Sequence, residues 1–212
     1  RDLIVAAAEA GADAVKFQLF RAVRLVTRNA PSAGYQLDAG QGIDQHAMLA
    51  RLELAPEDFA DLADVARQKS IDFLATPFSL PDLEFLLRVG VEAIKLASTD
   101  IVNGPLLDAA GRSGLPVIAS TGAAELNEVA AAVDRLRNSR VGPLALLHCV
   151  SSYPARDEEA NLAVIATLGR TFGCVAGFSD HSSSVTMGAH AVAAGARLVE
   201  KHFTLDHDRP GP

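Results

Sequence analysis

The sequence has few cysteines, and they are not placed to form a cross-link or a thiolate metal site. Only Cys149 and Cys174 are present among the 212 residues, and they form no C-x-x-C pair. Two thiols cannot provide a disulfide framework for a chain of this length, and a zinc site built from thiolates is excluded by their spacing. We therefore expect a reduced, cytoplasmic setting.

Long apolar runs and basic tracts are also missing. The hydrophobic runs are short and end at glycine, proline or a charged residue, so none approaches the roughly 18 residues of a membrane-spanning helix. The 19 basic and 26 acidic residues give a net charge of −7 at pH 7, without a Lys/Arg-rich stretch. We expect neither a membrane nor a nucleic acid as a partner. Because the chain opens inside an amphipathic helical pattern at Arg1, we also expect the natural N-terminus to lie upstream.

The sequence does contain a repeated alternation of apolar runs and helical segments, about every 25 to 30 residues. The runs are continuous rather than alternating, which is typical of parallel strands covered on both faces. The expected strands are Ala12 to Gln18, Ile71 to Thr76, Ala93 to Ser98, Pro116 to Ser120, Leu144 to Val150, Val175 to Ser179 and Arg197 to His202. The expected helices are Pro56 to Lys69, Pro81 to Val89, Gly104 to Arg112, Glu125 to Arg137, Asn161 to Phe172 and Ser183 to Ala194.

This alternation predicts an α/β fold with a parallel sheet. A helix over Arg1 to Ala10 precedes the first visible strand, so we expect a (β/α)8 TIM barrel whose first strand is missing from the chain, with residues 1–212 as one domain. A doubly wound open sheet is the alternative, but the Gly-x-Gly-x-x-Gly turn of a nucleotide-binding sheet does not occur. The long insertion from Arg21 to Leu54 is expected to form a loop over one mouth of the barrel.

Polar residues end most of the expected strands, where a barrel of this kind gathers its active site. Lysine ammonium groups and serine hydroxyls from several strands suit a small ligand that carries phosphate and carboxylate groups. Alternatively, each lysine extends to solvent and each serine closes a turn, but six converging residues favour a binding site. The six are Lys16, Lys95, Ser98, Ser120, Ser151 and Ser179.

Two histidines end consecutive strands on inward faces. His181 and His202 would supply two neutral nitrogen ligands to a divalent metal and leave positions open for a substrate carbonyl. The alternative is two unrelated polar histidines. Asp100 and Glu200 are candidates for proton transfer, although Asp100 is equally suited to cap the next helix. Asp180 is a candidate to orient the imidazoles.

Three further residues lie in or near the expected strand ends, and the sequence pattern assigns none of them a catalytic role. Gln18 shares the inward face of its strand with Lys16 because residues two apart point the same way. Tyr153, followed by Pro154, is expected to shape the rim of the site. His148 points to the opposite face from its neighbours, which indicates a core histidine beneath a helix.

Seven motifs in order resemble the sialic acid synthase family over essentially the whole chain: AVKFQ, LATPFS, IKLASTD, IASTG, LLHCVSSYP, GFSDHS and EKHFTLDHDRPGP. The pair GFSDH and EKHFTLD is the most distinctive. The resemblance implies a (β/α)8 barrel that condenses phosphoenolpyruvate with N-acetylmannosamine or a related N-acetylated amino sugar. The products are a nine-carbon sialic-type sugar acid and phosphate. It also implies a homodimer.

The resemblance assigns roles to the residues already singled out. His181 and His202 would bind Mn²⁺ or Mg²⁺, and the six lysines and serines would surround phosphoenolpyruvate. Gln18 and Tyr153 would lie near the substrates. Asp100 and Glu200 would move protons, while Lys95 would stabilise developing charge.

The sequence departs from the family pattern in several places. The family's first strand, with a Glu and an Asn-His turn, and its C-terminal antifreeze-like domain, which contributes an Arg to the neighbouring subunit, are absent from these residues. An Asp that follows the family's last motif is absent too. Some relatives have Glu at the position of Asp100 and Asn at that of Ser151. Two alternatives stay open: another phosphoenolpyruvate-dependent 3-deoxy sugar acid synthase, and a ligand-binding barrel without catalysis.

Overall fold

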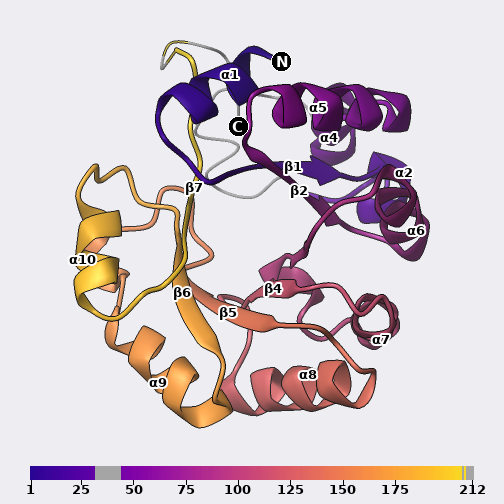
Figure 1. Ribbon diagram of the computed structural model, residues 1–212. Helices are drawn as coiled ribbons and strands as arrows, with labels where there is room; N and C mark the ends of the chain where they lie inside the picture. Colours follow the sequence, from indigo (N-terminus) through magenta and orange to yellow (C-terminus); the bar gives the residue numbers. More distant parts are fainter. Residues whose placement is uncertain (32–43, 207, 209–212) are drawn as a thin grey trace. The chain divides into compact units, whose positions relative to one another are not determined.

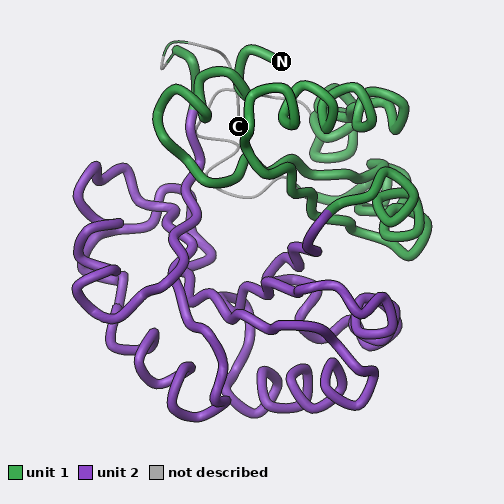
Figure 2. The backbone as a smooth tube through the Cα atoms, viewed as in Figure 1, with its two compact units in different colours: residues 1–91, 204–212 green, residues 92–203 purple. Residues whose placement is uncertain are grey.

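The computed structural model describes residues 1–31, 44–206 and 208. The chain divides into two compact units, coloured separately in Figure 2. Unit 1 contains residues 1–91 and 204–212, and unit 2 contains residues 92–203. All seven expected strands are present, and every described strand pairing is parallel, which confirms the α/β class.

Unit 1 is built around the parallel pair β1 and β2, in register from Ala14 opposite Asp72 to Leu19 opposite Pro77. Helix α5 packs against β2, where Phe59 is fully buried with its ring 6.4 Å from that of Phe73. The elements are α1 (Asp2–Glu9), β1 (Ala14–Leu19), α2 (Ala22–Leu25), α4 (Gln45–Leu52), α5 (Pro56–Gln68), β2 (Asp72–Pro77) and α6 (Leu80–Val89).

The expectation of a plain loop from Arg21 to Leu54 is wrong where the segment is described, because α2 and α4 lie in it. Asp44 is the N-cap of α4, and its side chain accepts a hydrogen bond from the backbone N–H of Ala47 at 2.8 Å. Met48 is buried. An Asp cap followed by an eight-residue amphipathic stretch is a helix signal too short to outweigh the glycines that precede it. Residues 32–43 of the expected loop lie outside the described part.

Unit 2 contains five parallel strands paired in chain order, β3 to β7. Helix α9 packs against β5 and β6, and α10 packs against β6 and β7, so these strands are covered by helices as Figure 1 shows. The elements are β3 (Ile94–Leu96), η1 (Ser98–Asp100), α7 (Gly104–Arg112), β4 (Val117–Ser120), α8 (Leu126–Asn138), β5 (Leu144–Cys149), η2 (Asp157–Glu159), α9 (Ala163–Phe172), β6 (Val175–Asp180), α10 (Met187–Ala193) and β7 (Val199–Lys201). Helix α10 begins later than the expected Ser183, because Ser182, Ser184 and Thr186 form turn hydrogen bonds with one another.

Strands β6 and β7 approach so closely that one position on β6 admits only glycine. A Cβ on Gly177 would lie 2.3 Å from the carbonyl oxygen of Leu198 and 2.7 Å from Leu147 Cδ2. The neighbouring N–H of Phe178 donates to that same Leu198 carbonyl at 2.9 Å. The main chain of the two strands therefore sets the distance between them.

His148 is a core histidine, as the alternation predicts. Its Nε2 lies 2.8 Å from the carbonyl oxygen of Ala160, and its ring centroid lies 5.7 Å from that of Phe178. Since a carbonyl only accepts, Nε2 carries the proton and the ring binds in its neutral form. Burial lowers the pKa of His148 below its ordinary value of 6.5, although the hydrogen bond to Ala160 opposes this shift.

We expect this histidine to make the protein less stable in mild acid. The unfolded chain takes up a proton near pH 6.5, whereas the folded chain resists it, so the free energy of unfolding falls as the pH drops below about 6.5. Replacing His148 with Gln should make this fall less steep. Urea unfolding of both proteins between pH 7.5 and 5.5 measures the difference, and the variant keeps the other histidines as internal controls. Identical slopes would contradict the prediction.

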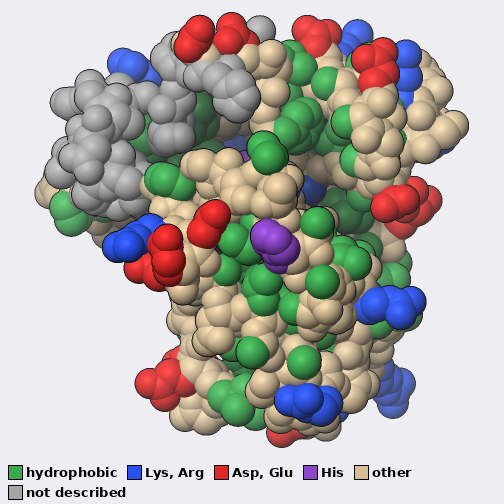
Figure 3. Space-filling model, turned by 90° about the vertical axis from the view of Figure 1, so that its left-hand side faces the viewer, with side chains coloured by type: hydrophobic (Ala, Val, Ile, Leu, Met, Phe, Trp, Pro, Cys, Tyr) green, Lys and Arg blue, Asp and Glu red, His purple; other side chains and the backbone are tan. Residues whose placement is uncertain are grey.

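The described surface of unit 2 leaves several apolar side chains in contact with solvent. Val185 is 96% and Val192 58% exposed, the first before and the second on α10. Figure 3 views the molecule from the α10 side and shows apolar side chains on that face. Both cysteines are free. In the described part of the chain, no helix combines the length and the apolar character needed to cross a bilayer.

Candidate active site

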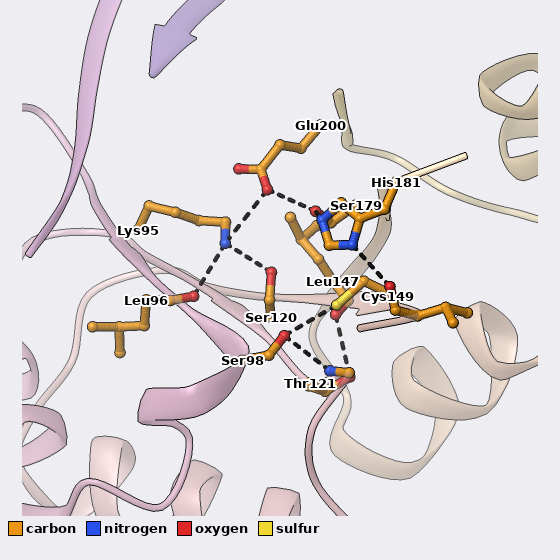
Figure 4. A network of polar contacts seen from close by, with 12 residues as sticks. Lys95, Leu96, Ser98, Ser120, Thr121, Leu147, Cys149, Ser179, His181 and Glu200 are labelled. Atoms are coloured by element: carbon orange, nitrogen blue, oxygen red, sulfur yellow. Dashed lines mark hydrogen bonds and ion pairs between the residues drawn. The ribbon is translucent and has the colours of Figure 1, made fainter. Parts of the chain in front are cut away.

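The carboxyl ends of the unit 2 strands bring a buried lysine together with hydroxyl and carboxylate groups (Figure 4). Lys95, on β3, is 3% exposed. Its Nζ donates to Ser120 Oγ at 2.7 Å and to the carbonyl oxygen of Leu96 at 3.1 Å, and it lies 3.6 Å from Glu200 Oε1. A buried ammonium group needs such partners, because an uncompensated charge in a protein interior is costly. Three of the predicted site residues therefore meet at one point.

A second set of contacts extends this cluster to His181. The register pairs Ser179 on β6 with Glu200 on β7, and Ser179 Oγ donates to Glu200 Oε1 at 2.7 Å. The same hydroxyl oxygen lies 3.3 Å from His181 Nε2. Because Ser179 has one proton and gives it to Glu200, the lone pair of the imidazole nitrogen is not satisfied by this serine. A continuous row of polar atoms thus runs from Lys95 to His181.

The main chain fixes the tautomer of His181. Its Nδ1 lies 2.8 Å from the carbonyl oxygen of Val150, which only accepts, so Nδ1 carries the proton and Nε2 carries a lone pair. Burial lowers the pKa of His181, while the Val150 hydrogen bond and the Glu200 charge oppose this shift. A neutral ring with a bare Nε2 is the form in which histidine binds metal.

His202 and Tyr153 lie beside this ring. The ring centroids of His181 and His202 are 5.5 Å apart. Tyr153 stacks on His181 with a centroid distance of 4.4 Å, meets His202 edge-on at 6.0 Å, and is 41% exposed. The side chain of Tyr153 therefore forms part of the rim, as expected.

Two neighbouring imidazoles fit the predicted divalent metal as a pair of nitrogen donors. His181 presents its unprotonated Nε2 toward the cluster, with the Tyr153 hydroxyl oxygen 3.5 Å away, and His202 lies close enough for both rings to serve one ion. Within the residues that the structure describes, no group of three or more His, Cys, Asp or Glu side chains is arranged to hold a metal. A metal held by the pair would keep most of its coordination positions open.

Ser98 and Ser151 lie on either side of a tight junction between the β4 turn and the end of β5. Ser98 Oγ accepts from the N–H of Gly122 at 3.1 Å and lies 3.0 Å from Cys149 Sγ. A Cβ on Gly122 would lie 2.5 Å from Cys149 Sγ and 2.9 Å from Ser151 Oγ. Sequence reasoning missed Gly122 and Cys149, and only the S-T-G order after a strand signalled a close approach.

Asp100 is buried on η1, directly after β3, and is not a helix cap. Asn103 caps α7 instead, accepting from the N–H of Leu106, and also donates to Asp100 Oδ1 at 2.9 Å. The capping alternative for Asp100 is therefore wrong. Its Oδ2 is buried without a hydrogen-bond partner among the described residues. Burial raises the pKa of Asp100, although the Asn103 hydrogen bond opposes the shift.

Lys16 and Gln18 lie in unit 1. Both are on β1, in register with Leu74 and Thr76, and alternation directs them to the same face. Lys16 is half-buried and Gln18 is exposed. Their contribution to the cluster in unit 2 stays a prediction.

The hydrogen bonds of the Asp180 side chain go to Lys201 and Ser182 and not directly to an imidazole, contrary to expectation. Its Oδ2 accepts from Lys201 Nζ at 2.6 Å, and its Oδ1 accepts from the N–H and the hydroxyl of Ser182 at 2.8 and 2.7 Å. Burial alone would raise its pKa, but the hydrogen bonds from Lys201 and Ser182 outweigh burial and lower the pKa of Asp180. Sequence reasoning missed Lys201, although the alternation that turns Glu200 and His202 inward places it on the opposite face with Asp180.

Fold and site together define an α/β protein that gathers a buried lysine, hydroxyls, a carboxylate and two histidines at the carboxyl ends of parallel strands. The chain belongs to the NeuB family, whose model matches residues 3–212.

Named relatives agree with this membership. The chain is 41% identical to N,N'-diacetyllegionaminic acid synthase of Legionella pneumophila, over all of this chain and 61% of that protein. It is 40% identical to the spore coat polysaccharide biosynthesis protein SpsE of Bacillus subtilis, over 99% of this chain and 56% of that protein. The crystal structure of an N-acetylneuraminic acid synthetase from Leptospira borgpetersenii in complex with citrate superposes with a TM-score of 0.85 at 38% identity, covering 97% of this chain and 67% of that one. The chain spans about three fifths of the length of the curated relatives it matches.

Proposed function

We propose that this chain is the catalytic part of a synthase that condenses phosphoenolpyruvate with an N-acetylated amino sugar to give a sialic-type sugar acid and phosphate. The observation that carries the proposal is the buried Lys95, hydrogen-bonded to Ser120 and 3.6 Å from Glu200, at strand ends of a NeuB family member. Two similar proteins bear the names of a legionaminic acid synthase and an N-acetylneuraminic acid synthetase, which supports this class of product.

Phosphoenolpyruvate is a suitable ligand for the lysine and serine cluster. Its phosphate and carboxylate groups carry negative charge, and a buried ammonium group binds such groups strongly through charge-assisted hydrogen bonds. Lys95 and Ser120 supply donors within the described cluster. Ser98, Ser151, Ser179 and, from unit 1, Lys16 are proposed as further contacts, and Gln18 and Tyr153 as contacts to the substrates.

A divalent metal fits beside this ligand. His181 and His202 would hold Mn²⁺ or Mg²⁺, and the ion would polarise the aldehyde of the open-chain sugar as a Lewis acid. The Val150 carbonyl keeps the Nε2 of His181 free of a proton for this purpose. Tyr153, stacked on His181, limits the motion of that ring.

In the proposed reaction, C3 of the enol forms a carbon–carbon bond with the sugar's aldehyde carbon. Water adds to C2, and the bond from C2 to the phosphate oxygen breaks to release phosphate. Glu200 is suited to accept a proton, since its carboxylate already faces Lys95 and Ser179. Asp100, buried with its Oδ2 unpartnered among the described residues, is proposed to deliver a proton. Lys95 stabilises the developing negative charge.

Phosphate release from phosphoenolpyruvate tests this proposal. The assay uses the full-length protein with Mn²⁺ and a panel of aldoses, including N-acetylmannosamine, arabinose 5-phosphate and erythrose 4-phosphate. Release that depends on an N-acetylated amino sugar is the expected result. Release only with a phosphorylated aldose would favour a 3-deoxy sugar acid synthase instead. Tight phosphoenolpyruvate binding without release for any sugar would favour a ligand-binding barrel and overturn the catalytic assignments.

The remaining parts of the sequence prediction belong to the same proposal. We propose that the seven parallel strands are part of an eight-stranded barrel and that the full-length protein is a cytoplasmic homodimer. Light scattering on the full-length protein measures the assembly, with twice the monomer mass as the expected result.

A further inference from the structure

We propose that the Asp180–Lys201 ion pair, which joins the ends of β6 and β7 beside His181 and His202, is a positioning element for the two histidines. The proposal rests on the proposed function, in which these histidines hold the metal. It assigns a role to two residues that lie outside the cluster around Lys95.

The burial and the hydrogen bonds of the Asp180–Lys201 pair are those of a structural contact between two strands. The Asp180 side chain is fully buried, and both of its oxygens accept hydrogen bonds, from Lys201 on one side and Ser182 on the other. The Lys201 side chain is 38% exposed, so its ammonium group keeps access to water while it pairs with the buried carboxylate. A short charge-assisted contact of this kind holds its two strands in one geometry.

The register explains why the pair acts on the histidines. Asp180 is directly opposite Lys201, and each of them precedes one histidine in the chain. Because side chains alternate along a strand, the ion pair lies on one face and the two imidazoles on the other. A shift of either strand end that breaks the ion pair therefore also displaces an imidazole.

Ser182, the residue that follows His181, is bonded to the same ion pair. Lys201 Nζ also donates to the Ser182 carbonyl oxygen at 2.8 Å, and the Ser182 N–H donates to Asp180. The residues before and after His181 are thus held by the same lysine. The ring itself is held by the Val150 carbonyl, and the His181 carbonyl accepts from the N–H of Ala155 at 2.9 Å. The Asp180–Lys201 pair and the Lys201–Ser182 hydrogen bond tie this segment to β7 on one face, and the Ser179–Glu200 hydrogen bond ties it on the other.

Mn²⁺ binding measured without substrates is the test, because a positioning residue should change metal affinity even when no reaction occurs. The variants are Lys201→Met and Asp180→Asn, followed by Lys201→Arg as the conservative replacement. Loss of a group that is hydrogen-bonded to a metal ligand typically weakens metal binding 10-fold to 100-fold, and the lower end of this range applies to the ion pair because its hydrogen bonds go to Ser182 and not to an imidazole. We expect the first two variants to weaken Mn²⁺ binding by about 10-fold or more. Lys201→Arg, which keeps the positive charge, should retain most of the Mn²⁺ affinity of the unchanged protein. Phosphoenolpyruvate binding should stay within about twofold of that of the unchanged protein in all three variants.

The matched control is another ion pair of unit 2, between Arg135 on α8 and Asp108 on α7, at 2.6 Å. Asp108→Asn removes a comparable contact far along the chain from either histidine and should leave Mn²⁺ affinity unchanged. Thermal unfolding of every variant shows whether a loss of Mn²⁺ binding comes from misfolding or from displaced histidines. If Asp180→Asn does not fold, Lys201→Met carries the test, since its side chain is partly exposed.

The outcomes separate this inference from the function on which it rests. Unchanged Mn²⁺ affinity in folded Lys201→Met, together with loss of binding in His181→Ala, would refute the positioning role and leave the metal site intact. Unchanged binding in His181→Ala would instead refute the metal site. Equal weakening by Lys201→Met and by the Asp108→Asn control would show a general loss of stability and would also overturn the proposal.

Discussion

Replacing Lys95 with Met is expected to reduce kcat/KM for phosphoenolpyruvate by about 1,000-fold. Lys95 is buried, and its ammonium group is the cation nearest to Glu200 among the contacts of the described cluster. Truncating one partner of a buried, hydrogen-bonded charge pair across a binding interface costs about 2–5 kcal/mol of binding free energy, and about 4 kcal/mol corresponds to a factor of about 1,000. The same change removes the donor proposed for the ligand's phosphate or carboxylate group.

Calorimetric titration with phosphoenolpyruvate and steady-state kinetics measure this effect. Lys69→Met is the matched control, because Lys69 is exposed just after α5 and should leave both measurements unchanged. Lys95→Arg tests whether the shape of this side chain matters as well as its charge. The larger guanidinium keeps the charge but does not fit between Ser120 and Leu96 without rearrangement. Full affinity in Lys95→Met would remove this lysine from the binding site.

Replacing His181 with Ala is expected to abolish metal-dependent turnover, with a loss of at least about 1,000-fold. The change removes the bare Nε2 that faces the cluster and leaves the Val150 carbonyl without its donor. Polarisation of a substrate carbonyl by a metal lowers the barrier by several kcal/mol, and loss of about 4 kcal/mol gives the stated factor. His202→Ala should have a similar effect, because the pair is proposed to share one ion.

Mn²⁺ titration by electron paramagnetic resonance, alongside the turnover assay, tests this prediction. His190→Ala is the control, because His190 lies on α10 with its side chain exposed. Thermal unfolding of His181→Ala checks that loss of the Tyr153 stacking contact has not unfolded the rim. A His181→Ala or His202→Ala protein with full activity would exclude the metal assignment.

The strands were predicted well from the sequence because parallel strands covered on both faces appear as unbroken apolar runs. The run from Val175 to Ser179 and the observed β6, Val175–Asp180, differ by one residue. Helix α4 was missed because its eight residues carry a weak apolar pattern directly after a glycine-containing segment. The start of α10 was placed too early because the serines before it form turns, which periodicity does not detect.

The sequence predicts which residues face inward at the strand ends, but it does not predict which of them are hydrogen-bond partners. Alternation is enough to place Ser179 and His181 on one face, and the structure joins both to the Glu200 strand end. Partner choice depends on the register between strands, which a single sequence does not contain. Alternation therefore could not show that Asp180 pairs with Lys201, nor could local spacing show that Asn103 rather than Asp100 caps α7.

The contact between Gly177 and the Leu198 carbonyl has a consequence for how the active site can be altered. The span between the two histidine-bearing strands is a property of the backbone, and no side chain acts as a spacer between them at this point. Residues around the rim, such as the exposed Tyr153, are therefore open to exchange without changing that span. Attempts to change the proposed acceptor should begin at the rim, because a larger residue at Gly177 would push β6 and β7 apart.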